Sequence, residues 1–482
     1  MSLLKKDWEK RANAVNKILR GAGIEYTPAI HFYTYAGRIP KSIIEKNSDV
    51  PNMDLSDYHA IIYIHIPFCT RKCSFCPFFS VVSQAVPDAY VDALVAEIGM
   101  LSQKNKLPSR YTLDFGGGSP NLLSIGQLTR ILSAFEKSRI AEIRFEMHPG
   151  SIKDEKYIAE LKSLGVNRFS IGLQTTDCGK LACVNRGHGT KEFEAAISWI
   201  QKTRLPHNVD MIFGGFADET MESVQNDFSY VFSKMKPDFV TAYQMCLTLG
   251  TPERQNYLSD TSRFPKSDMI MQMRALVQQS AEDCGYSYIF DENFVNDAKH
   301  PGYIGKMRVA QKIAILGIGP GTFSYVNDLS NKTGRCWYSF FDLAAYIACV
   351  SSGNTAIDKS ADLGIDYMNS FDVIAQLKAK GMVGIDSAER IPLVIAPLVR
   401  LGLLRERQNH FEFTKTGRLL ENLICCAIHP KHMWQELAIA RKQEGYDGRY
   451  DLFFEPEPVL KFIDFLENLN PKESCGEKIC SE

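Results

Sequence analysis

The sequence has 482 residues, of which 45% are hydrophobic and 23% charged, ordinary proportions for a globular protein. The 55 Lys and Arg residues balance 56 Asp and Glu residues, and this formal charge of -1 argues against a generally basic nucleic-acid binder or an acidic solvating tail. The 13 cysteines are odd in number and too sparse for a disulfide scaffold, so their positions matter more than their total.

The N-terminal segment, MSLLKKDWEKRANAVNKILRG, mixes charged residues through its apolar positions and does not have the pattern of a secretory signal. No run approaches the roughly 18 uninterrupted apolar residues of a membrane-spanning helix. We therefore expect a cytoplasmic protein with no membrane partner, in which most cysteines are reduced thiols or metal ligands.

The predicted elements begin with residues 1–55, an N-terminal extension that holds an amphipathic helix over about Lys5–Leu19 and then an irregular aromatic segment. From about residue 60, short apolar runs alternate with amphipathic stretches, and the runs cover 61–66, 111–118, 142–147, 167–174, 208–214 and 238–245. Such alternation predicts βαβ units and a parallel sheet. These units, with no obvious change of strand order, favour an α/β fold with a partial (βα)6 TIM-like barrel over 56–300, whose chemistry would lie at the carboxyl ends of the strands.

Residues 301–455 form the predicted C-terminal domain, with a Gly-rich turn over 316–328 and then helices, a short hairpin and a final helix over 366–428. This order resembles a winged-helix module. Because no basic stripe points to DNA, we expect a structural or substrate-covering domain and no nucleic-acid partner. Residues 456–482 read as a charged, loosely held tail in which Cys475 and Cys480 are an incidental pair.

Three cysteines, Cys69, Cys73 and Cys76, follow the first predicted strand at C-x3-C-x2-C spacing. Thiolates this close in a loop can face one centre, and three of them leave one metal position open, whereas four would complete a zinc site or a fully ligated cluster. Two alternatives are three unrelated buried cysteines and a zinc site completed by His65. We favour an iron–sulfur cluster, since strand alternation does not aim His65 at the centre of the loop.

This motif, with Phe75 before the last cysteine, resembles the radical SAM superfamily. The resemblance implies that the three cysteines hold a [4Fe-4S] cluster and that S-adenosylmethionine (SAM) chelates its open iron. One electron would then cleave SAM to a 5′-deoxyadenosyl radical, so the cofactor carries the difficult chemistry. The resemblance also implies a small-molecule substrate and an electron donor such as flavodoxin or ferredoxin.

Further motifs resemble the family of oxygen-independent coproporphyrinogen III oxidase (HemN-like proteins), in the family's order over about residues 60–250. They are Tyr63-Ile-His65-Ile-Pro-Phe-Cys69, Gly116-Gly-Gly-Ser-Pro120, Phe145-Glu146-x-x-Pro149, Asn167-Arg-x-Ser-x-Gly-x-Gln174, Val184-Asn-Arg186, Val209-Asp210-x-x-Phe213-Gly214 and Ala242-Tyr243-Gln244. The segment APLVRLGLLRERQNHFEFTKTGRLLENLICC is similar to that family's C-terminal domain. The resemblance therefore covers most of the chain.

The resemblance implies a cofactor site made of Tyr63, Phe75, Gly117, Gly118, Ser119, Glu146, Gln174, Arg186 and Asp210. The residue types suit this site: glycines let backbone approach a ligand, a carboxylate binds an ammonium or ribose hydroxyls, and an arginine fork pairs with a carboxylate. We expect Gln174 and Asp210 at strand ends, facing the mouth of the barrel. Taken singly, each of these nine residues could equally be an ordinary turn, core or surface residue. The same applies to His148 and His188, which we interpret as solvated loop histidines rather than an acid or base.

Two positions depart from the HemN-like pattern. The oxidase carries a further cysteine where this chain has Phe78, and haem-chaperone relatives carry His-Asn-x-x-Tyr-Trp where this chain has Asp297-Ala-Lys-His300-Pro-Gly-Tyr303. The stretch from Tyr63 to Ile98 looks more like the class C radical SAM methyltransferases, in which two SAM molecules bind.

The likeness to these methyltransferases predicts transfer of a methyl or methylene group from a second SAM to an sp2 carbon of an aromatic, heteroaromatic or tetrapyrrole substrate. The alternatives are oxidative decarboxylation of coproporphyrinogen III and a haem-binding chaperone. The remaining cysteines, among them Cys178, Cys183, Cys246, Cys425 and Cys426, are interpreted as structural.

Overall fold

A computed structural model of the chain describes residues 5–28, 52–301, 310–389, 391–443 and 455–469, together with Pro40 and Ile44. The chain folds as two compact units. Unit 1 joins residues 1–36, 211–309 and 365–482, and unit 2 joins residues 37–210 and 310–364. The predicted division at residues 55, 300 and 455 stays a prediction, and Cys475 and Cys480 lie outside the described residues. Within the ranges above, every helix is too short or too polar to cross a bilayer.

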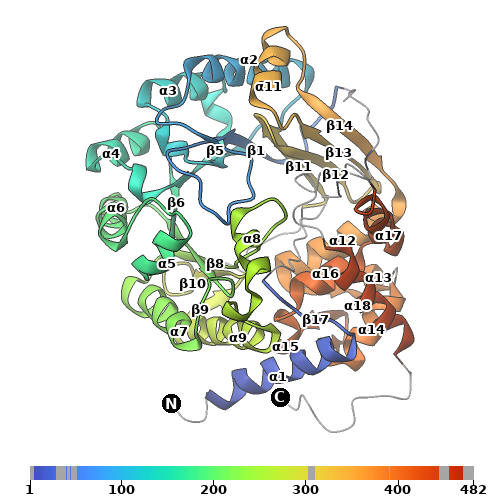
Figure 1. Ribbon diagram of the computed structural model, residues 1–482. Coiled ribbons are helices and arrows are strands. Elements are labelled where there is room, and N and C mark those ends of the chain that lie inside the picture. The colour runs from blue at the N-terminus through green and yellow to red at the C-terminus, as the bar shows by residue number, and fades with distance from the viewer. Residues whose placement is uncertain are drawn as a thin grey trace. The chain divides into compact units, whose positions relative to one another are not determined.

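Unit 2 is built on parallel strands. β1 (His59–Ile66), β4 (Tyr111–Gly117), β5 (Ile140–Met147) and β6 (Arg168–Gln174) lie side by side in that order. Between them run α2 (Asp88–Lys104), α3 (Ile125–Ser133) and α4 (Glu155–Ser163), and α6 (Thr190–Lys202) follows β6. These helices line the outer side of the strands in Figure 1. The predicted alternation of strands and helices is therefore confirmed, and each strand ends close to its predicted limit.

The two faces of this sheet differ in polarity. Alternate residues such as Ile62, Ile64, Phe115 and Phe145 are fully buried. The opposite face carries a row of cross-strand neighbours formed by Tyr63, Asp114, Arg144 and Arg168. Glu142 binds Arg144 at 2.7 Å and lies 3.9 Å from Arg168. Barrel interiors are usually filled by branched apolar side chains, so this charged layer is unusual and brings polar groups beneath the strand ends.

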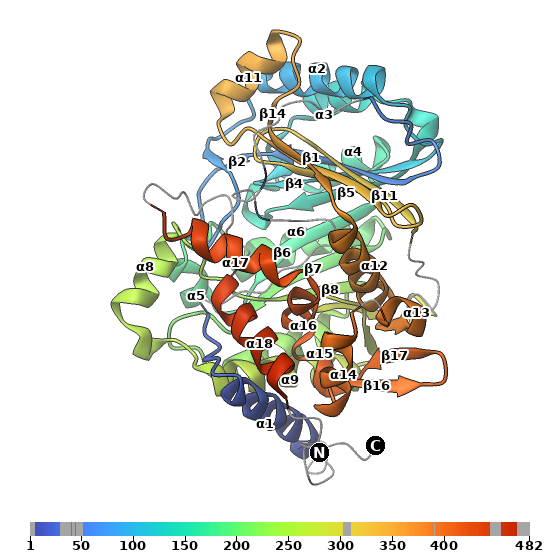
Figure 2. The same ribbon diagram turned by 90° about the vertical axis from the view of Figure 1, so that its right-hand side faces the viewer.

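The second part of unit 2 adds β11 (Lys312–Ile318), which is parallel to β1, and then the antiparallel strands β12 (Phe323–Asp328), β13 (Thr333–Ser339) and β14 (Ile357–Leu363). The prediction of a turn over the whole of 316–328 is wrong. Only the residues around Gly319 and Gly321 form the turn, both with positive φ, because the flanking segments pair as strands. Helix α11 (Leu343–Ser351) lies beside α2 in both Figure 1 and Figure 2.

A half-buried carboxylate on α2 holds the turn before β12. Glu97 Oε2 accepts hydrogen bonds from the Gly319 N–H at 2.9 Å and from the Tyr346 hydroxyl at 2.6 Å. A neighbouring tyrosine, Tyr90, donates from its hydroxyl to the carbonyl of His65 at 2.5 Å. Burial raises the pKa of Glu97 to about 7, although its two hydrogen bonds act in the opposite direction. The fold therefore favours the neutral form of this carboxyl.

We expect Glu97→Gln to flatten the pH dependence of stability. A raised pKa means that the stability contribution of Glu97 is complete below about pH 4.5 and is lost as pH rises through about 7. The glutamine still accepts both hydrogen bonds and carries no charge. The difference in unfolding free energy between about pH 5 and about pH 8 should shrink by about 2 kcal/mol, allowing for partial exposure. Urea unfolding at both pH values measures this, and an unchanged difference would contradict it.

Unit 1 contains the N-terminal helix α1 (Lys5–Gly21), which packs on α9 (Ser267–Asp283) and confirms the predicted amphipathic helix. In this unit β10 (Asn293–Asn296) pairs antiparallel with β8 (Phe239–Gln244) on one side and with β9 (Tyr286–Tyr288) on the other. Helices α7 (Met221–Ser229) and α8 (Pro252–Ser259) complete this part. The strand β7 (His207–Phe213) crosses the division between the units.

The C-terminal part of unit 1 has the predicted order of helices and a hairpin. α12 (Ile365–Lys380), β15 (Met382–Gly384), α13 (Ile385–Ala388) and α14 (Pro392–Arg400) precede the hairpin of β16 (Leu404–Arg407) and β17 (His410–Phe413). α15 (Lys415–Arg418), α16 (Glu421–Ile428), α17 (Lys431–Ala440) and α18 (Pro456–Asn468) follow. Figure 2 shows α14, α16 and α17 around α18, against which all three pack. The prediction of a loosely held tail over 456–482 is therefore wrong for residues 456–468, because α18 buries Val459 and Phe462.

Buried ionic contacts join this module to the β9–β10 turn within unit 1. Lys378 of α12 donates to Asp291 and, at 2.8 Å, to Asn422 Oδ1, and all three side chains are at least nine-tenths buried. Arg274 of α9 binds Glu292 at 2.9 Å. Asp291 and Glu292 both have positive φ, a strained turn conformation for residues with side chains. The strain is tolerated because each carboxylate has a buried cationic partner.

Candidate active site

The cysteine motif forms a loop of unit 2 that begins at the end of β1. β2 (Phe68–Cys69) pairs with β3 (Val81–Val82), and Cys73 and Cys76 lie between these two short strands. Cys73 is buried and the other two thiols are half-buried. The Ser74 N–H donates to the Val184 carbonyl at 3.0 Å and Asn185 Nδ2 donates to the Lys72 carbonyl at 2.8 Å. The loop is thus tied to the segment that contains Arg186.

Two side chains point hydrogen-bond donors at the sulfur atoms. Ser119 Oγ lies 3.7 Å from Cys69 Sγ, and Arg186 Nη1 lies 3.6 Å from Cys73 Sγ. Burial raises the pKa of the Cys69 thiol, and it raises the pKa of Cys76 to about 11. Thiolates at these positions therefore need a positive partner, which is what a bound metal group supplies. The three cysteines with their two donors fit a thiolate-ligated cluster.

His65 does not complete a zinc site with these cysteines. Its Nε2 lies 2.9 Å from the Phe79 carbonyl and its Nδ1 lies 3.2 Å from the Tyr63 hydroxyl. Burial lowers the pKa of this imidazole to about 4. Both ring nitrogens are engaged, so the alternative of zinc held with His65 is not supported. Across the described ranges, no three His, Cys, Asp or Glu side chains are placed to hold a single metal ion.

The glycines at the end of β4 let its backbone approach the cysteine loop. The N–H groups of Gly118 and Ser119 donate to the carbonyls of Ile66 and Phe68, both at 2.8 Å. A Cβ on Gly118 would lie only 2.6 Å from the Phe68 carbonyl oxygen, and Gly117 has a φ of 105° that favours glycine. Ser119 is buried at the start of the next turn. These predicted site residues thus hold the backbone on which Cys69 lies.

We expect Gly118→Ala to displace the start of the cysteine loop. The added methyl group would meet three backbone atoms of Ile66 and Phe68 at 2.6–2.9 Å, and backbone cannot move aside as a side chain can. The unfolding free energy should fall by about 1–3 kcal/mol, a typical cost of overpacking, and the iron content of purified protein should fall with it. Gly126→Ala in α3 is the control, since its nearest neighbour would lie at 3.9 Å. Equal iron content in both variants would contradict this expectation.

Glu146, Tyr63 and Gly116 meet beside this strand end. A Cβ on Gly116 would lie 2.7 Å from Glu146 Oε2 and 2.9 Å from the Tyr63 ring, so both side chains lie over the glycine. Glu146 is the penultimate residue of β5 and keeps contact with solvent. Loss of water around the carboxyl raises its pKa to about 8. The negative charges of Asp114 and Asp210 raise the pKa further, with smaller effects. A ligand cation bound beside this exposed side chain would favour its charged form.

Gln174 shows two signs of a ligand site. It is the last residue of β6 and has a φ of 74°, a strained conformation for a residue with a side chain. It is 8% exposed, and its Oε1 is buried without a hydrogen-bond partner among the described residues. Buried acceptors are rarely left unpaired, so a missing donor is expected here. A bound cofactor would fit this unpaired acceptor.

Arg186 connects the cysteine loop to Gln174. Besides Cys73, its guanidinium donates to the Gly172 carbonyl at 3.0 Å and to His188 Nε2 at 3.1 Å. The His188 ring packs edge-on against that of His148 at 5.2 Å. Burial, with Arg186 as the next cause, lowers the pKa of His188 to about 4 and that of His148 to about 2. His188 contacts Arg186 directly, His148 packs on His188, and both rings are neutral, so their interpretation as solvated loop residues is wrong.

Asp210 lies in the middle of β7, not at its end as predicted, because β7 continues to Phe213. Its carboxylate accepts from Asn208 Nδ2 at 2.7 Å and from Ser170 Oγ at 3.1 Å. Sequence reasoning missed Ser170 and Asn208 as members of this site. Ser170, Gly172 and Gln174 are every second residue of the predicted strand. This alternation could have indicated that they share one face of β6.

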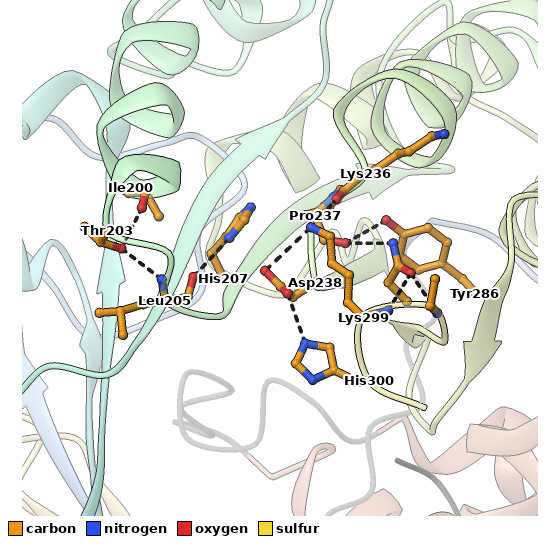
Figure 3. Close-up of polar contacts among 12 residues, drawn as sticks. Ile200, Thr203, Leu205, His207, Lys236, Pro237, Asp238, Tyr286, Lys299 and His300 are labelled. Atoms are coloured by element: carbon orange, nitrogen blue, oxygen red, sulfur yellow. Dashed lines mark hydrogen bonds and ion pairs between the residues drawn. The ribbon is translucent and has the colours of Figure 1, made fainter. Parts of the chain in front are cut away.

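The other residues singled out from the sequence lie in different surroundings. Phe75 is half-buried between two of the cysteines. Cys178 and Cys183 lie exposed on α5 (Cys178–Cys183), while Cys425 and Cys426 are buried in α16. In unit 1, His300 Nε2 lies 3.0 Å from Asp238 Oδ1, as Figure 3 shows. His300 thus supports the start of β8, and Tyr303 lies outside the described residues.

Comparison with known proteins supports the predicted superfamily. The radical SAM superfamily model matches residues 63–230. The chain is 24% identical to the "Heme chaperone HemW" of Mycobacterium tuberculosis over 380 residues, covering 75% of this chain and 93% of the relative. Its match to the HemW of Buchnera aphidicola is 29% identical and covers 47% and 60%. The oxygen-independent coproporphyrinogen III oxidase of Synechocystis is 25% identical, with coverage of 58% and 64%.

The solved structure of coproporphyrinogen III oxidase (HemN) from Escherichia coli, which its description calls a radical SAM enzyme, superposes with a TM-score of 0.67. The identity is 22%, with 77% of this chain and 90% of that chain covered. This confirms the predicted fold class, a TIM-like α/β barrel with a helical N-terminal part and a C-terminal domain. The superfamily implies a [4Fe-4S] cluster and SAM. Together these matches show that the chain is similar to the radical SAM superfamily over residues 63–230 and, over most of its length, to proteins named HemN and HemW.

Proposed function

We propose that this chain cleaves SAM reductively and acts on a tetrapyrrole. The observation that carries the proposal is the contact of Arg186 with Cys73 beside the unpaired Oε1 of Gln174, which brings the cysteine loop and a buried hydrogen-bond acceptor together. The relatives support the substrate class, since their names refer to haem and to coproporphyrinogen III.

Each part of the site has a task in this proposal. Cys69, Cys73 and Cys76 would hold the [4Fe-4S] cluster, which with SAM bound supplies an electron that generates a 5′-deoxyadenosyl radical. Arg186 would pair with the SAM carboxylate as a planar fork. Glu146 would accept from the ammonium or ribose of SAM, and Gln174 would accept a hydrogen bond through its Oε1. Asp210 is held by Asn208 and Ser170, so its carboxylate is oriented before a ligand binds.

Two reactions on the substrate are compatible with this proposal. Oxidative decarboxylation of a propionate side chain is supported by the HemN fold and the coproporphyrinogen oxidase relative. Transfer of a one-carbon unit from a second SAM stays a prediction that rests on Phe78 and the stretch around the cysteines.

Haem delivery is the second candidate function. The match to a haem chaperone over 93% of its length favours it, whereas the sequence at Asp297–His300 departs from the chaperone motif.

The test uses anaerobically reconstituted protein, dithionite, coproporphyrinogen III and SAM with a deuterated methyl group. We expect 5′-deoxyadenosine in wild-type protein and none in a variant without Cys73. Product without the label that has lost carbon dioxide and hydrogen indicates the oxidase, and labelled product indicates one-carbon transfer. No deoxyadenosine, with tight haem binding in a spectral titration, would replace the proposal by the chaperone.

A further inference from the structure

We propose that His188 is a positioning residue, which holds the Arg186 guanidinium in the orientation that receives SAM. It rests on the proposed function, in which Arg186 pairs with the SAM carboxylate. The role of His188 is to act through Arg186 and not on the reacting groups. The contacts of both side chains, all within unit 2, support it.

Arg186 is held through all three nitrogen atoms of its guanidinium. Nη1 lies 3.6 Å from Cys73 Sγ, Nη2 donates to the Gly172 carbonyl at 3.0 Å, and Nε donates to His188 Nε2 at 3.1 Å. An arginine side chain has five N–H groups, and these contacts take three of them. One N–H on each of Nη1 and Nη2 is left, which matches the two oxygens of a carboxylate.

Only one tautomer of His188 fits its two hydrogen bonds. Its Nδ1 lies 3.2 Å from the Gly189 carbonyl oxygen, which can only accept, so Nδ1 carries the ring proton. Nε2 is then an unprotonated acceptor that faces the N–H of Arg186 Nε, which can only donate. Burial, followed by the Arg186 charge, lowers the pKa of His188 to about 4, so the neutral form is present at neutral pH. The imidazole is therefore a constant acceptor for Arg186.

The place of His188 is fixed by packing on both sides. A Cβ on Gly150, in the turn after β5, would lie 2.5 Å from the carbonyl oxygen that precedes His188 and 3.2 Å from His188 Cβ, so this glycine lets the two segments touch. After His188, the Gly189 N–H donates to Glu192 Oε2 at 2.9 Å at the start of α6. His188 is 7% exposed, and the ring of His148 packs edge-on against it. Arg186 thus has a partner whose backbone and ring are both held.

A guanidinium that is ordered in advance binds a carboxylate more tightly than a mobile one. An arginine side chain has many rotamers, and ordering it at the moment of binding weakens the affinity. The hydrogen bond to His188 orders Arg186 before a ligand arrives. Without that acceptor the Nε–H has no partner, and the side chain is restrained only at the far end of the guanidinium. A histidine that served folding alone would have no such effect on a ligand.

The experiment measures SAM affinity in variants of the reconstituted, reduced protein. SAM is titrated against the change in the electron paramagnetic resonance signal, which reports binding rather than turnover. H188L removes the acceptor, and the dissociation constant of SAM should rise about tenfold or more, as expected for a lost hydrogen bond to a charged group. In H188Q an amide oxygen reaches nearly as far as the imidazole Nε2, so the constant should return to within about threefold of wild type. Asparagine is one methylene shorter, so H188N is the matched control and should bind SAM as weakly as H188L.

A double variant tests whether His188 acts through Arg186. In R186K the single ammonium replaces three nitrogens, so the separate contact of Nε with His188 is lost. H188L should therefore change the dissociation constant of SAM by less than about twofold in R186K, although it changes it about tenfold in wild type. Iron content and the urea midpoint of each variant show whether the fold and the cluster are kept.

Each result decides the question. Wild-type affinity in H188L would overturn the proposal, because Arg186 would then be ordered without His188. Equal losses in H188L and H188Q would overturn it too, since ring packing and not hydrogen bonding would be the cause. An equal effect of H188L in R186K and in wild type would mean that His188 acts by another route. If H188L assembles no cluster, H188N and H188Q give the same comparison. A wild-type signal that SAM leaves unchanged would instead contradict the proposed function, so the two failures are distinguishable.

Discussion

Cys73→Ala is expected to remove the brown colour, the iron and the SAM-cleaving activity of the reconstituted protein together. Cys73 is the buried member of the three cysteines and its sulfur contacts Arg186 at 3.6 Å. Two remaining thiolates cannot hold a four-iron cluster with a single open iron. The rate of deoxyadenosine formation should fall by about 10⁶-fold or more, the lower end of enzymatic accelerations, which in practice means no detectable product.

The matched control is Cys178→Ala. Cys178 belongs to the same unit but lies exposed on α5, where its sulfur contacts Thr190 at 3.1 Å. This variant should keep wild-type iron content and rate. Retention of a four-iron cluster in Cys73→Ala, shown by iron analysis and absorption spectra, would contradict the assignment of the ligands. Loss of the cluster in both variants would mean that the control position contributes to the site.

Lys378→Met should cause the largest loss of stability among the buried ion pairs of unit 1. The substitution keeps the side-chain volume but leaves Asp291 buried beside Glu421, which accepts a hydrogen bond from the Asp291 N–H at 3.3 Å. Removing one partner of a buried pair costs about 3–5 kcal/mol, because the other charge is left uncompensated. The urea midpoint, followed by circular dichroism, should fall accordingly.

The double variant Lys378→Met/Asp291→Asn separates lost charge pairing from lost packing. Without the Asp291 carboxylate its uncompensated charge is removed, and Glu421 keeps Arg418 as its cationic partner at 2.8 Å, so most of the stability should return. A chain of this length can unfold in more than one step. The urea midpoint to compare between wild type and the variants is therefore that of the step in which the C-terminal helices unfold. A single variant within about 1 kcal/mol of wild type would show that Asp291 finds solvent or another partner.

The sequence allowed much of unit 2 to be predicted, because its strands and helices alternate with the spacing that buried sheets require. The limits of β1, β4, β5 and β6 lie close to the predicted runs. The segment 316–328 was mispredicted since its glycines suggested one long turn. Only long-range pairing of β11 with β1, far away in sequence, makes its flanks into strands. Such pairing carries no local signal.

The candidate site was predictable by residue type but not by geometry. The cysteine spacing and the glycines at the end of β4 identified the loop and its neighbour. The left-handed backbone of Gln174 and its unpaired oxygen have no sequence signature, because they arise from how β6 ends against Arg186 and Gly172. The neutral state of His148 and His188 was equally hidden, since it follows from burial beside the Arg186 charge.

Electron paramagnetic resonance of the anaerobically reduced protein, with and without SAM, tests the central claim most directly. The claim is that Cys69, Cys73 and Cys76 hold a four-iron cluster whose open iron meets SAM beside Arg186 and Gln174. We predict the signal of a reduced [4Fe-4S] cluster whose g values change on addition of SAM and whose change is lost in Arg186→Ala. A colourless zinc protein, or a cluster signal that SAM leaves unchanged, would contradict the account.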